Sequence, residues 1–359
     1  MRKAGLIALV FAAVLATAQD KPQTTNAKIV ERPVSGTLAS TIQGVAATGE
    51  TAWIGYAVPV IAGEQHMCCF NYRHIDEIKK MSGGCCGGCR LEKQGGENFS
   101  MGRMEGCSPS GDEFFVLARV SGGKVEKVRS YSTDCQLDLG GKTLYWLGDP
   151  KPAESIAWLS GFASHYAQDD DTPAEGALNA IAFHRDPAAD GALQVFIAPN
   201  QNRKLRQQAA FWLGNSRGQR GFEIVRDTIR NDQDTKFREE ATFALSQSEV
   251  PAAQQELIRV AHQDADSEVR GQALFWLAQK AGNKAGKAIT DAIDNDPDTA
   301  VKKKAVFALS QMDHNEGVPL LINVAKTHKN PAVRKEAIFW LGQSGDPRAL
   351  DYIEDILQK

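Results

Sequence analysis

The chain has 359 residues, of which 41 are basic and 44 acidic, so its formal net charge is −3. This balance argues against a nucleic-acid partner, because nucleic-acid binding needs a concentrated basic surface. No stretch approaches the ~20 consecutive apolar residues of a membrane-spanning helix, and the length is sufficient for two domains.

The N-terminal segment has the order of a secretory signal peptide. Arg2 and Lys3 precede an apolar run over residues 4–16, and small residues lead to Gln19. We therefore expect residues 1–18 to be removed on export, which places the protein in a periplasm or outside the cell. Residues 19–35 lack periodicity and predict a flexible lead-in.

Residues 36–148 predict a small β-rich domain with many glycines. Residues 51–61 are expected to form a strand, with Pro59 at a sheet edge or a strand end. Residues 114–131 predict a β-hairpin around the turn 121–124, and residues 143–147 a further strand.

All seven cysteines fall in this domain: Cys68, Cys69, Cys85, Cys86, Cys89, Cys107 and Cys135. A small exported domain is usually held together by disulfides, so all seven cysteines are candidates for disulfide bonds. A bridge from Cys107 to Cys135 would enclose the hairpin. Seven is an odd number, so at least one thiol stays free or pairs with another molecule.

Two alternatives remain open for the same residues. No cofactor is expected under the disulfide interpretation, but soft ligands for copper or zinc are concentrated here: His66, Cys68, Cys69, His74, Cys85, Cys86 and Cys89. Their spacing does not match a standard zinc site. The pair Cys86 and Cys89 could instead exchange disulfides, although no helix start follows to lower a thiol pKa.

From residue 149 onward the same sequence pattern recurs at a constant interval. This interval equals the distance along the sequence from Asn202 to Asp234. One column of the repeat holds helix N-cap residues, and aliphatic, alanine and leucine columns follow on one face of a first helix. A second helix completes each unit. The N-cap column is Asn202, Asp234, Asp266, Asp298 and Asn330.

Helical hairpins of this size cannot bury their own apolar faces, so a fixed period predicts that they stack into a solenoid. The phase extends upstream to Thr172, which makes six repeats within residues 149–359. A helix over residues 153–166 is expected to seal the upstream end. The predicted fold is thus an α-solenoid preceded by a β-rich, cysteine-containing domain.

The pattern Asp-x-x-Val-[Arg/Lys]-x-x-Ala-x-x-x-Leu, present at residues 266–277 and 298–309, resembles the short HEAT-like repeats of the phycobilisome lyase type. The resemblance covers residues 170–359 and implies a scaffold that binds proteins, since such repeats are only occasionally enzymes. Residues 36–148 resemble no family that we recognise.

Enzymatic relatives are the alternative that this resemblance implies. The HEAT-like deoxyhypusine hydroxylases hold iron through His-Glu pairs, whereas the repeat histidines here are followed by other residues, as in His184-Arg185. The HEAT-like lyases act on phycobiliproteins inside the cell, where an exported chain would not meet them. The sequence has no hydrolase elbow or metalloprotease motif either, so no catalytic residue is assigned.

Two further columns carry the candidate binding residues. The phenylalanine column is Phe211, Phe243, Phe275, Phe307 and Phe339, and the glutamine column is Gln247, Gln279, Gln311 and Gln343. The phenylalanines lie about 150° from the middle of the buried stripe. Each ring either packs sideways against the next unit or belongs to an exposed ladder. Such a ladder would bind an extended peptide or a helix of a partner protein.

Two other columns predict packing. Trp212, Trp276 and Trp340 occur in every second repeat and alternate with alanines, which suggests bulky rings interlocking with small side chains. The basic column, which includes Arg206, is expected to pair with aspartates in the turns between repeats: Asp232, Asp264 and Asp296.

Overall fold

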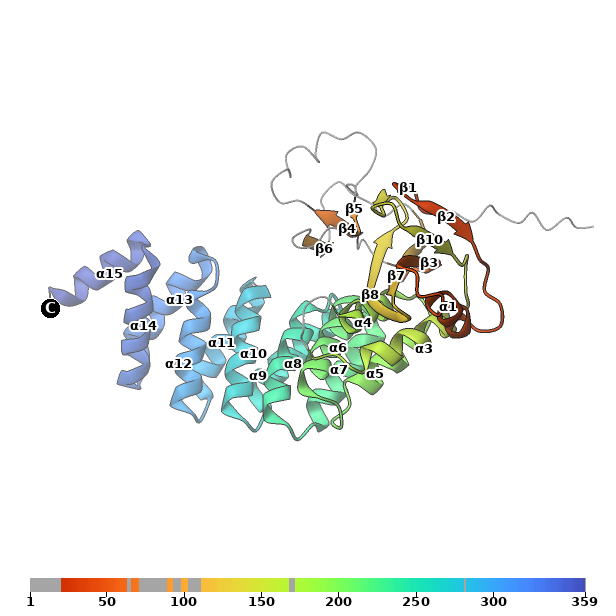
Figure 1. Ribbon diagram of the computed structural model, residues 1–359. Helices are drawn as coiled ribbons and strands as arrows, with labels where there is room; N and C mark the ends of the chain where they lie inside the picture. Colours follow the sequence, from red (N-terminus) through yellow and green to blue (C-terminus); the bar gives the residue numbers. More distant parts are fainter. Residues whose placement is uncertain are drawn as a thin grey trace, which may run out of the picture.

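The computed structural model of the chain describes residues 21–62, 66–70, 89–92, 98–102, 111–167, 172–280 and 282–358. The expected signal peptide lies outside these residues. A β-sheet region comes first and a stack of helical hairpins follows it, extending away from the sheet (Figure 1). This arrangement confirms the predicted fold class.

The main sheet has five strands and mixed direction. Parallel pairing joins the first three strands and antiparallel pairing the last three. The strands in spatial order are β2 (Lys28–Glu31), β10 (Thr143–Trp146), β3 (Ala52–Pro59), β7 (Glu113–Ser121) and β8 (Lys124–Ser132). The hairpin β7–β8 turns at residues 121–124, as predicted.

The region differs from the sequence-based predictions in a strand and a helix. Lys28–Glu31 pairs with β10 and is a strand, although a flexible lead-in was predicted for residues 19–35. A single edge strand of this length is too short to show periodicity. β3 lies in the middle of the sheet, and Pro59 is its last residue, so the prediction of a strand end is confirmed and that of a sheet edge is not. Helix α1 (Leu38–Ala46), which begins with a capping box at Thr37, was not anticipated.

The two faces of the sheet are covered differently. Side chains alternate along β3, so that Ile54 and Tyr56 face the helices while Trp53 faces away. On the helical face, α1, α3 (Pro152–Ala163) and the first hairpin contribute to one core. A small sheet covers the other face, in the order β1 (Thr24–Thr25), β9 (Leu137–Asp138) and β5 (Cys89–Arg90). Separately from these two sheets, β4 (His66–Phe70) pairs with β6 (Asn98–Gly102).

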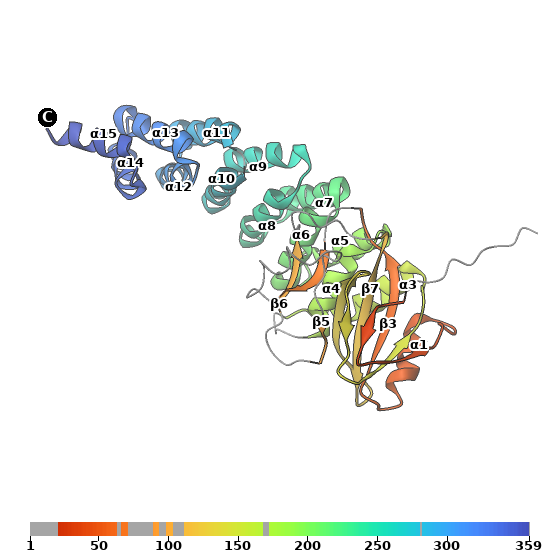
Figure 2. The ribbon, with the colours of Figure 1, turned by 90° about the horizontal axis from the view of Figure 1, so that it is seen from above.

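The solenoid contains six hairpins arranged in two rows of helices (Figure 2). The first helices are α4 (Pro173–Phe183), α6 (Arg203–Ser216), α8 (Thr235–Gln247), α10 (Ser267–Lys280), α12 (Thr299–Ser310) and α14 (Pro331–Ser344). The second helices are α5 (Ala188–Phe196), α7 (Gly218–Asn231), α9 (Pro251–Gln263), α11 (Gly282–Asn295), α13 (His314–Thr327) and α15 (Pro347–Leu357).

The predicted N-caps begin these first helices. The side-chain oxygen of Asn202 accepts from the Leu205 N–H at 2.9 Å, and that of Asp298 from the Ala300 N–H at 2.8 Å. Each cap satisfies an N–H group that has no partner inside the helix. The phase of the repeat read from the sequence is therefore the phase of the fold.

The sheet and the solenoid are packed directly on each other. A Cβ atom added to Gly176 of α4 would lie 1.9 Å from the Val128 carbonyl oxygen of β8, so only glycine allows this approach. The strand β3 also continues toward the solenoid, since the Ile61 N–H donates to the Phe183 carbonyl at 2.8 Å. One hydrophobic core runs from α1 through the sheet into the repeats. The sheet, and not α3 alone, therefore covers the upstream end of the stack.

Candidate binding face

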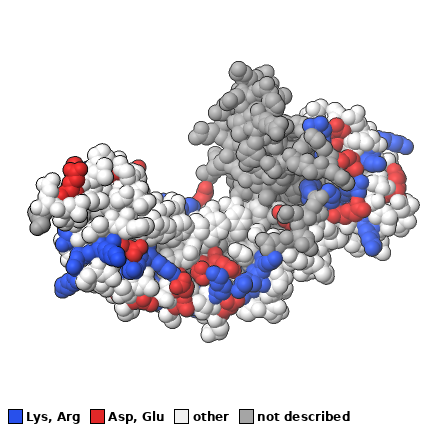
Figure 3. All heavy atoms as spheres, turned by 60° about the vertical axis from the view of Figure 1, so that its left-hand side comes forward, with Lys and Arg blue, Asp and Glu red and all other residues white. Residues whose placement is uncertain are grey.

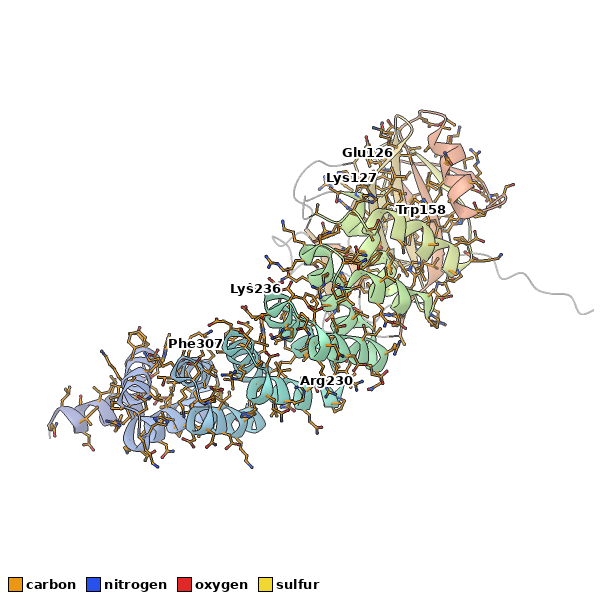
Figure 4. All side chains as sticks on the ribbon, turned by 90° about the horizontal axis from the view of Figure 1, so that it is seen from below. Glu126, Lys127, Trp158, Arg230, Lys236 and Phe307 are labelled. Atoms are coloured by element: carbon orange, nitrogen blue, oxygen red, sulfur yellow. The ribbon has the colours of Figure 1, made fainter. Side chains whose placement is uncertain are left out.

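The row of first helices carries a continuous series of aromatic rings, which we call the aromatic ladder. Its members in spatial order are Phe183, Trp212, Phe211, Phe243, Trp276, Phe275, Phe307, Trp340 and Phe339. Neighbouring ring centroids lie between 4.7 and 6.1 Å apart. In Figure 4, Phe307 lies on the side of α12 away from α13, while Arg230 lies on the row of second helices.

Two kinds of step alternate along this ladder. Phe211 and Phe243 stack with their planes 11° apart, and Phe275 and Phe307 with theirs 5° apart. Where the next repeat contains a tryptophan, the phenylalanine of the preceding repeat contacts the indole ring at a tilted angle. Phe243 and Trp276 make this contact with their ring centroids 4.7 Å apart. The tryptophan and phenylalanine columns therefore form one structure. Because tryptophan occurs only in every second repeat, the stacked and the tilted contacts alternate along the ladder.

The phenylalanine rings are packed and partly exposed at the same time. Phe211, Phe243, Phe275 and Phe307 are half-buried, and Phe339 at the end of the stack is 54% exposed. Because stacked neighbours cover much of the ring faces, the ring edges are what remains for a partner. Ring edges carry partial positive charge and suit oxygen acceptors.

The glutamine column lies on the same first helices, four residues after the phenylalanines of the third to sixth repeats. Gln279, Gln311 and Gln343 are exposed, and Gln247 is half-buried. The amide groups of Gln247 and Gln311 donate to the hydroxyls of Ser246 and Ser310, each at 3.1 Å. An amide offers both donors and an acceptor, so this row can pair with a peptide backbone.

Charged side chains near the ladder pair mainly with one another. Lys304 forms an ion pair with Glu268 of the previous repeat, and Lys303 lies 3.3 Å from Glu336 of the next one. On this side of the solenoid, basic and acidic side chains gather toward one edge and leave a broad uncharged area (Figure 3). The face therefore does not select a partner of strong charge.

Glu240 of α8 is an exception among these charged side chains. Its carboxyl pKa is raised because burial disfavours the charged form, and one of its oxygens is buried without a hydrogen bond. The basic group that pairs with it is Arg203 of the previous repeat, 3.9 Å away. Glu240 thus lies next to the ladder as an acceptor that is not fully used.

The basic column is structural, as predicted. Arg206 pairs with Asp232, and Arg238 and Arg270 pair with Asp264 and Asp296 at 3.0 and 2.7 Å. Each pair joins the first helix of one unit to the turn before the next. These arginines are therefore engaged between repeats and do not form an anion site.

The cysteine and histidine candidates can be placed only in part. Cys89 and Cys135 are fully buried in the core under the small sheet, and both are disulfide-bonded. His66, Cys68 and Cys69 belong to β4, but their side chains lie outside the described part of the chain. The same holds for all atoms of His74, Cys85, Cys86 and Cys107. Among described residues no group of three potential ligands is close enough to hold a metal.

Sequence reasoning missed the upstream start of the ladder. Phe183 is completely buried and meets Trp212 at 5.3 Å, so the ladder begins where the sheet packs on α4. Phe183 occupies the amide column of the repeat, not the phenylalanine column, and therefore gave no periodic signal. The alternation of tryptophan with alanine was the signal that could have linked the two aromatic columns.

The fold and this face define the class of the protein: an α-solenoid repeat scaffold joined to a β-sheet region. The model of the HEAT repeat family matches residues 189–278 and 286–359, so the solenoid is built from HEAT repeats and the resemblance seen in the sequence is confirmed. No curated protein matches the sequence. Within the described residues, no helix combines the length and apolarity needed to cross a bilayer.

Solved structures with similar folds include human deoxyhypusine hydroxylase, with 16% identity over 57% of this chain and 90% of that one, and a TM-score of 0.27. The CpcE and CpcF complex of phycocyanin lyase from a Nostoc species shares 18% identity over 43% of this chain and 98% of that one, with a TM-score of 0.33. Kap121p bound to Pho4p shares 13% identity over 58% of this chain and 27% of that one, with a TM-score of 0.34.

Proposed function

We propose that the protein is a scaffold whose row of first helices binds an extended segment of another protein. The observation that carries this proposal is the aromatic ladder with its adjacent row of amides. Ring edges and amide N–H groups together favour carbonyl oxygens, and an extended backbone presents such oxygens regularly. No catalytic role is proposed.

Substitution of single ladder residues tests this function. Phe243→Asp and Phe307→Asp add a carboxylate to a half-buried ring position on the binding face, so each should abolish partner capture from the fraction in which the protein occurs. Val195→Asp is the matched control, because Val195 is 58% exposed but belongs to α5 in the row of second helices. The full chain is used, since sheet and solenoid share one core.

Three results are informative in this experiment. Loss of capture in both phenylalanine variants, with circular dichroism spectra like those of the parent, supports the proposal. Equal loss in Val195→Asp would mean that capture does not depend on the ladder. Unchanged capture in all variants would exclude the ladder as the binding surface.

We also propose that the protein is exported and that its cysteine-containing region is held by disulfides. The signal-like order of residues 1–18 and the burial of Cys89 and Cys135 support this. Mass spectrometry of protein from the exported fraction tests both points at once. We expect a chain that begins at Gln19, with no more than one thiol reactive before reduction; an intact N-terminus in cytoplasmic fractions would contradict export.

A further inference from the structure

Two cavities of the solenoid occupy equivalent positions, two repeats apart in the sequence. One lies between the third and fourth hairpins and has a volume of about 280 Å³; the other lies between the fifth and sixth and measures about 150 Å³. Leu245, Ser246 and Leu257 line the first. Their equivalents Leu309, Ser310 and Leu321 line the second.

The alternation of repeats explains why cavities recur with this period. Each of the two lies where a repeat with alanine in the tryptophan column is followed by a repeat with tryptophan. Trp340 itself lines the smaller cavity, together with Gln311 and Gln343 of the amide row. The smaller cavity is therefore continuous with the proposed binding face. The larger one adjoins it through Ser246, whose hydroxyl accepts from the Gln247 amide at 3.1 Å.

Side chains at two positions account for the difference in volume. Ser248 in the larger cavity is replaced by Met312 in the smaller one, and Val250 is replaced by His314. Both cavities are lined by aliphatic, amide and hydroxyl side chains, and the larger one also by Glu249 and Lys280, which carry opposite charges. Each cavity is large enough for one aliphatic side chain.

We propose that the bound segment is an extended, uncharged stretch of a partner protein that inserts two apolar side chains, six residues apart, into these two cavities. This inference rests on the proposed binding function and specifies its partner. The pairing of Lys304 with Glu268, and of Lys303 with Glu336, leaves the face between the cavities without unbalanced charge, which matches an uncharged segment.

The spacing of six follows from repeat geometry and chain conformation. Packed helices lie about 8–10 Å apart, so two repeats separate the cavities by roughly 16–20 Å. An extended chain rises about 3.1–3.4 Å per residue, so five or six residues span that distance. Side chains at i and i+6 point to the same side in a β-strand, with period 2, and in polyproline II, with period 3. Side chains at i and i+5 point to the same side in neither conformation.

Synthetic peptides provide a direct test. A series of acetylated and amidated peptides carries two leucines, four to eight residues apart, in a background of proline, serine and glutamine. Binding to the full chain is measured by calorimetry and by the fluorescence of Trp340 and its neighbours. The six-residue spacing should bind about tenfold or more tightly than spacings of five or seven, because at those spacings only one of the two leucines can be buried.

Exchange of the cavity residues supplies matched variants. Ser248→Met gives the larger cavity the side chain of the smaller one, so the variant should keep its affinity for the leucine peptide but bind a peptide with phenylalanine at that position about tenfold more weakly than the parent does. Met312→Ser enlarges the other cavity and should permit phenylalanine in place of one leucine. Thermal melting of both variants shows whether they remain folded; Met312→Ser alone suffices if Ser248→Met does not fold.

The outcomes separate this inference from the proposed function. Equal affinities at all spacings, a maximum at another spacing, or no binding by any peptide at millimolar concentration would overturn the two-anchor inference. Loss of natural partner capture in Phe243→Asp and Phe307→Asp would still support the binding face. A maximum at six that Phe243→Asp leaves intact would instead contradict the role of the ladder.

Discussion

His184 and Ser155 are joined by a hydrogen bond of 2.9 Å between the His184 Nε2 atom and the Ser155 hydroxyl, where the sheet meets the first hairpin. The His184 Nδ1 atom lies 2.7 Å from the Ala180 carbonyl, so Nδ1 carries the proton and Nε2 accepts. The Tyr56 hydroxyl lies 2.9 Å from the same serine oxygen. All three side chains are fully buried, so this set is structural and not catalytic.

Burial lowers the pKa of His184 to about 4, with a smaller contribution in the same direction from Arg217 and an opposing one from Asp186. In the unfolded chain the pKa is about 6.5. The unfolded state therefore binds a proton that the folded state does not between pH 6.5 and 4. Stability is fully present above pH 6.5 and falls by about 3 kcal/mol as the pH drops to 4.

Urea unfolding of the parent and of His184→Gln, at several values between pH 7 and 4, checks this. The variant should be less stable at pH 7, but its free energy of unfolding should decline less toward pH 4. Parallel curves for the two proteins would show that His184 is not the titrating group.

Arg206 and Asp232 form a buried ion pair between the second and third repeats, with exposed side-chain fractions of 3% and 2%. Arg206→Met leaves the aspartate buried without its partner and should lower the free energy of unfolding by about 3–5 kcal/mol. Adding Asp232→Asn should restore part of that loss. Chemical denaturation of the single and double variants gives both values.

Lys302 in the same column is the control. Its amine donates only to the carbonyls of Ile293 and Asp294, at 2.8 and 2.6 Å, so Lys302→Met should cost about 1 kcal/mol. A loss as large as that of Arg206→Met would argue that the column acts through packing of its methylene groups.

Gly176 and Gly161 both lie in helices, but only one meets another backbone. Gly176→Ala places a methyl group against the Val128 carbonyl and should destabilise the junction by about 1–3 kcal/mol. No atom lies within 4 Å of a Cβ atom at Gly161, so Gly161→Ala should raise stability by about 0.5–1 kcal/mol through its helix propensity. Melting temperatures that shift in opposite directions would confirm the contrast.

The two ends of the aromatic ladder differ in burial, so alanine substitutions there should lower the free energy of unfolding by different amounts. Phe183 is 0% exposed, so Phe183→Ala should lower the free energy of unfolding by about 3–5 kcal/mol. Phe339 is 54% exposed, so Phe339→Ala should cost about 1 kcal/mol or less. Similar losses at both ends would mean that the ladder is stabilised by ring contacts along its whole length.

The helical repeats could be predicted largely from the sequence, because their determinants are local and recur. An N-cap such as Asp298 acts on N–H groups two or three residues away, and an asparagine or aspartate occupies this position in the second to sixth units. Even the pairing of Arg238 with Asp264 follows from the period, since the second, third and fourth repeats all place the two columns side by side.

The sheet region was less predictable for the opposite reason. Its pairings are made once and join distant residues, as when Lys28 lies beside Thr143. Lys28–Glu31 is too short for alternation to show, and α1 has no counterpart elsewhere in the chain.

The sequence by itself determined the repeat, its phase and the columns that lie on the candidate binding face. Only the tertiary structure decided that Phe243 meets Trp276, that Gly176 touches Val128, and that cavities open at alternate junctions. Periodicity fixes which face of a helix a residue occupies. Contacts across helices depend on the distance and rotation between neighbouring units, which are set by the packing of all their side chains together.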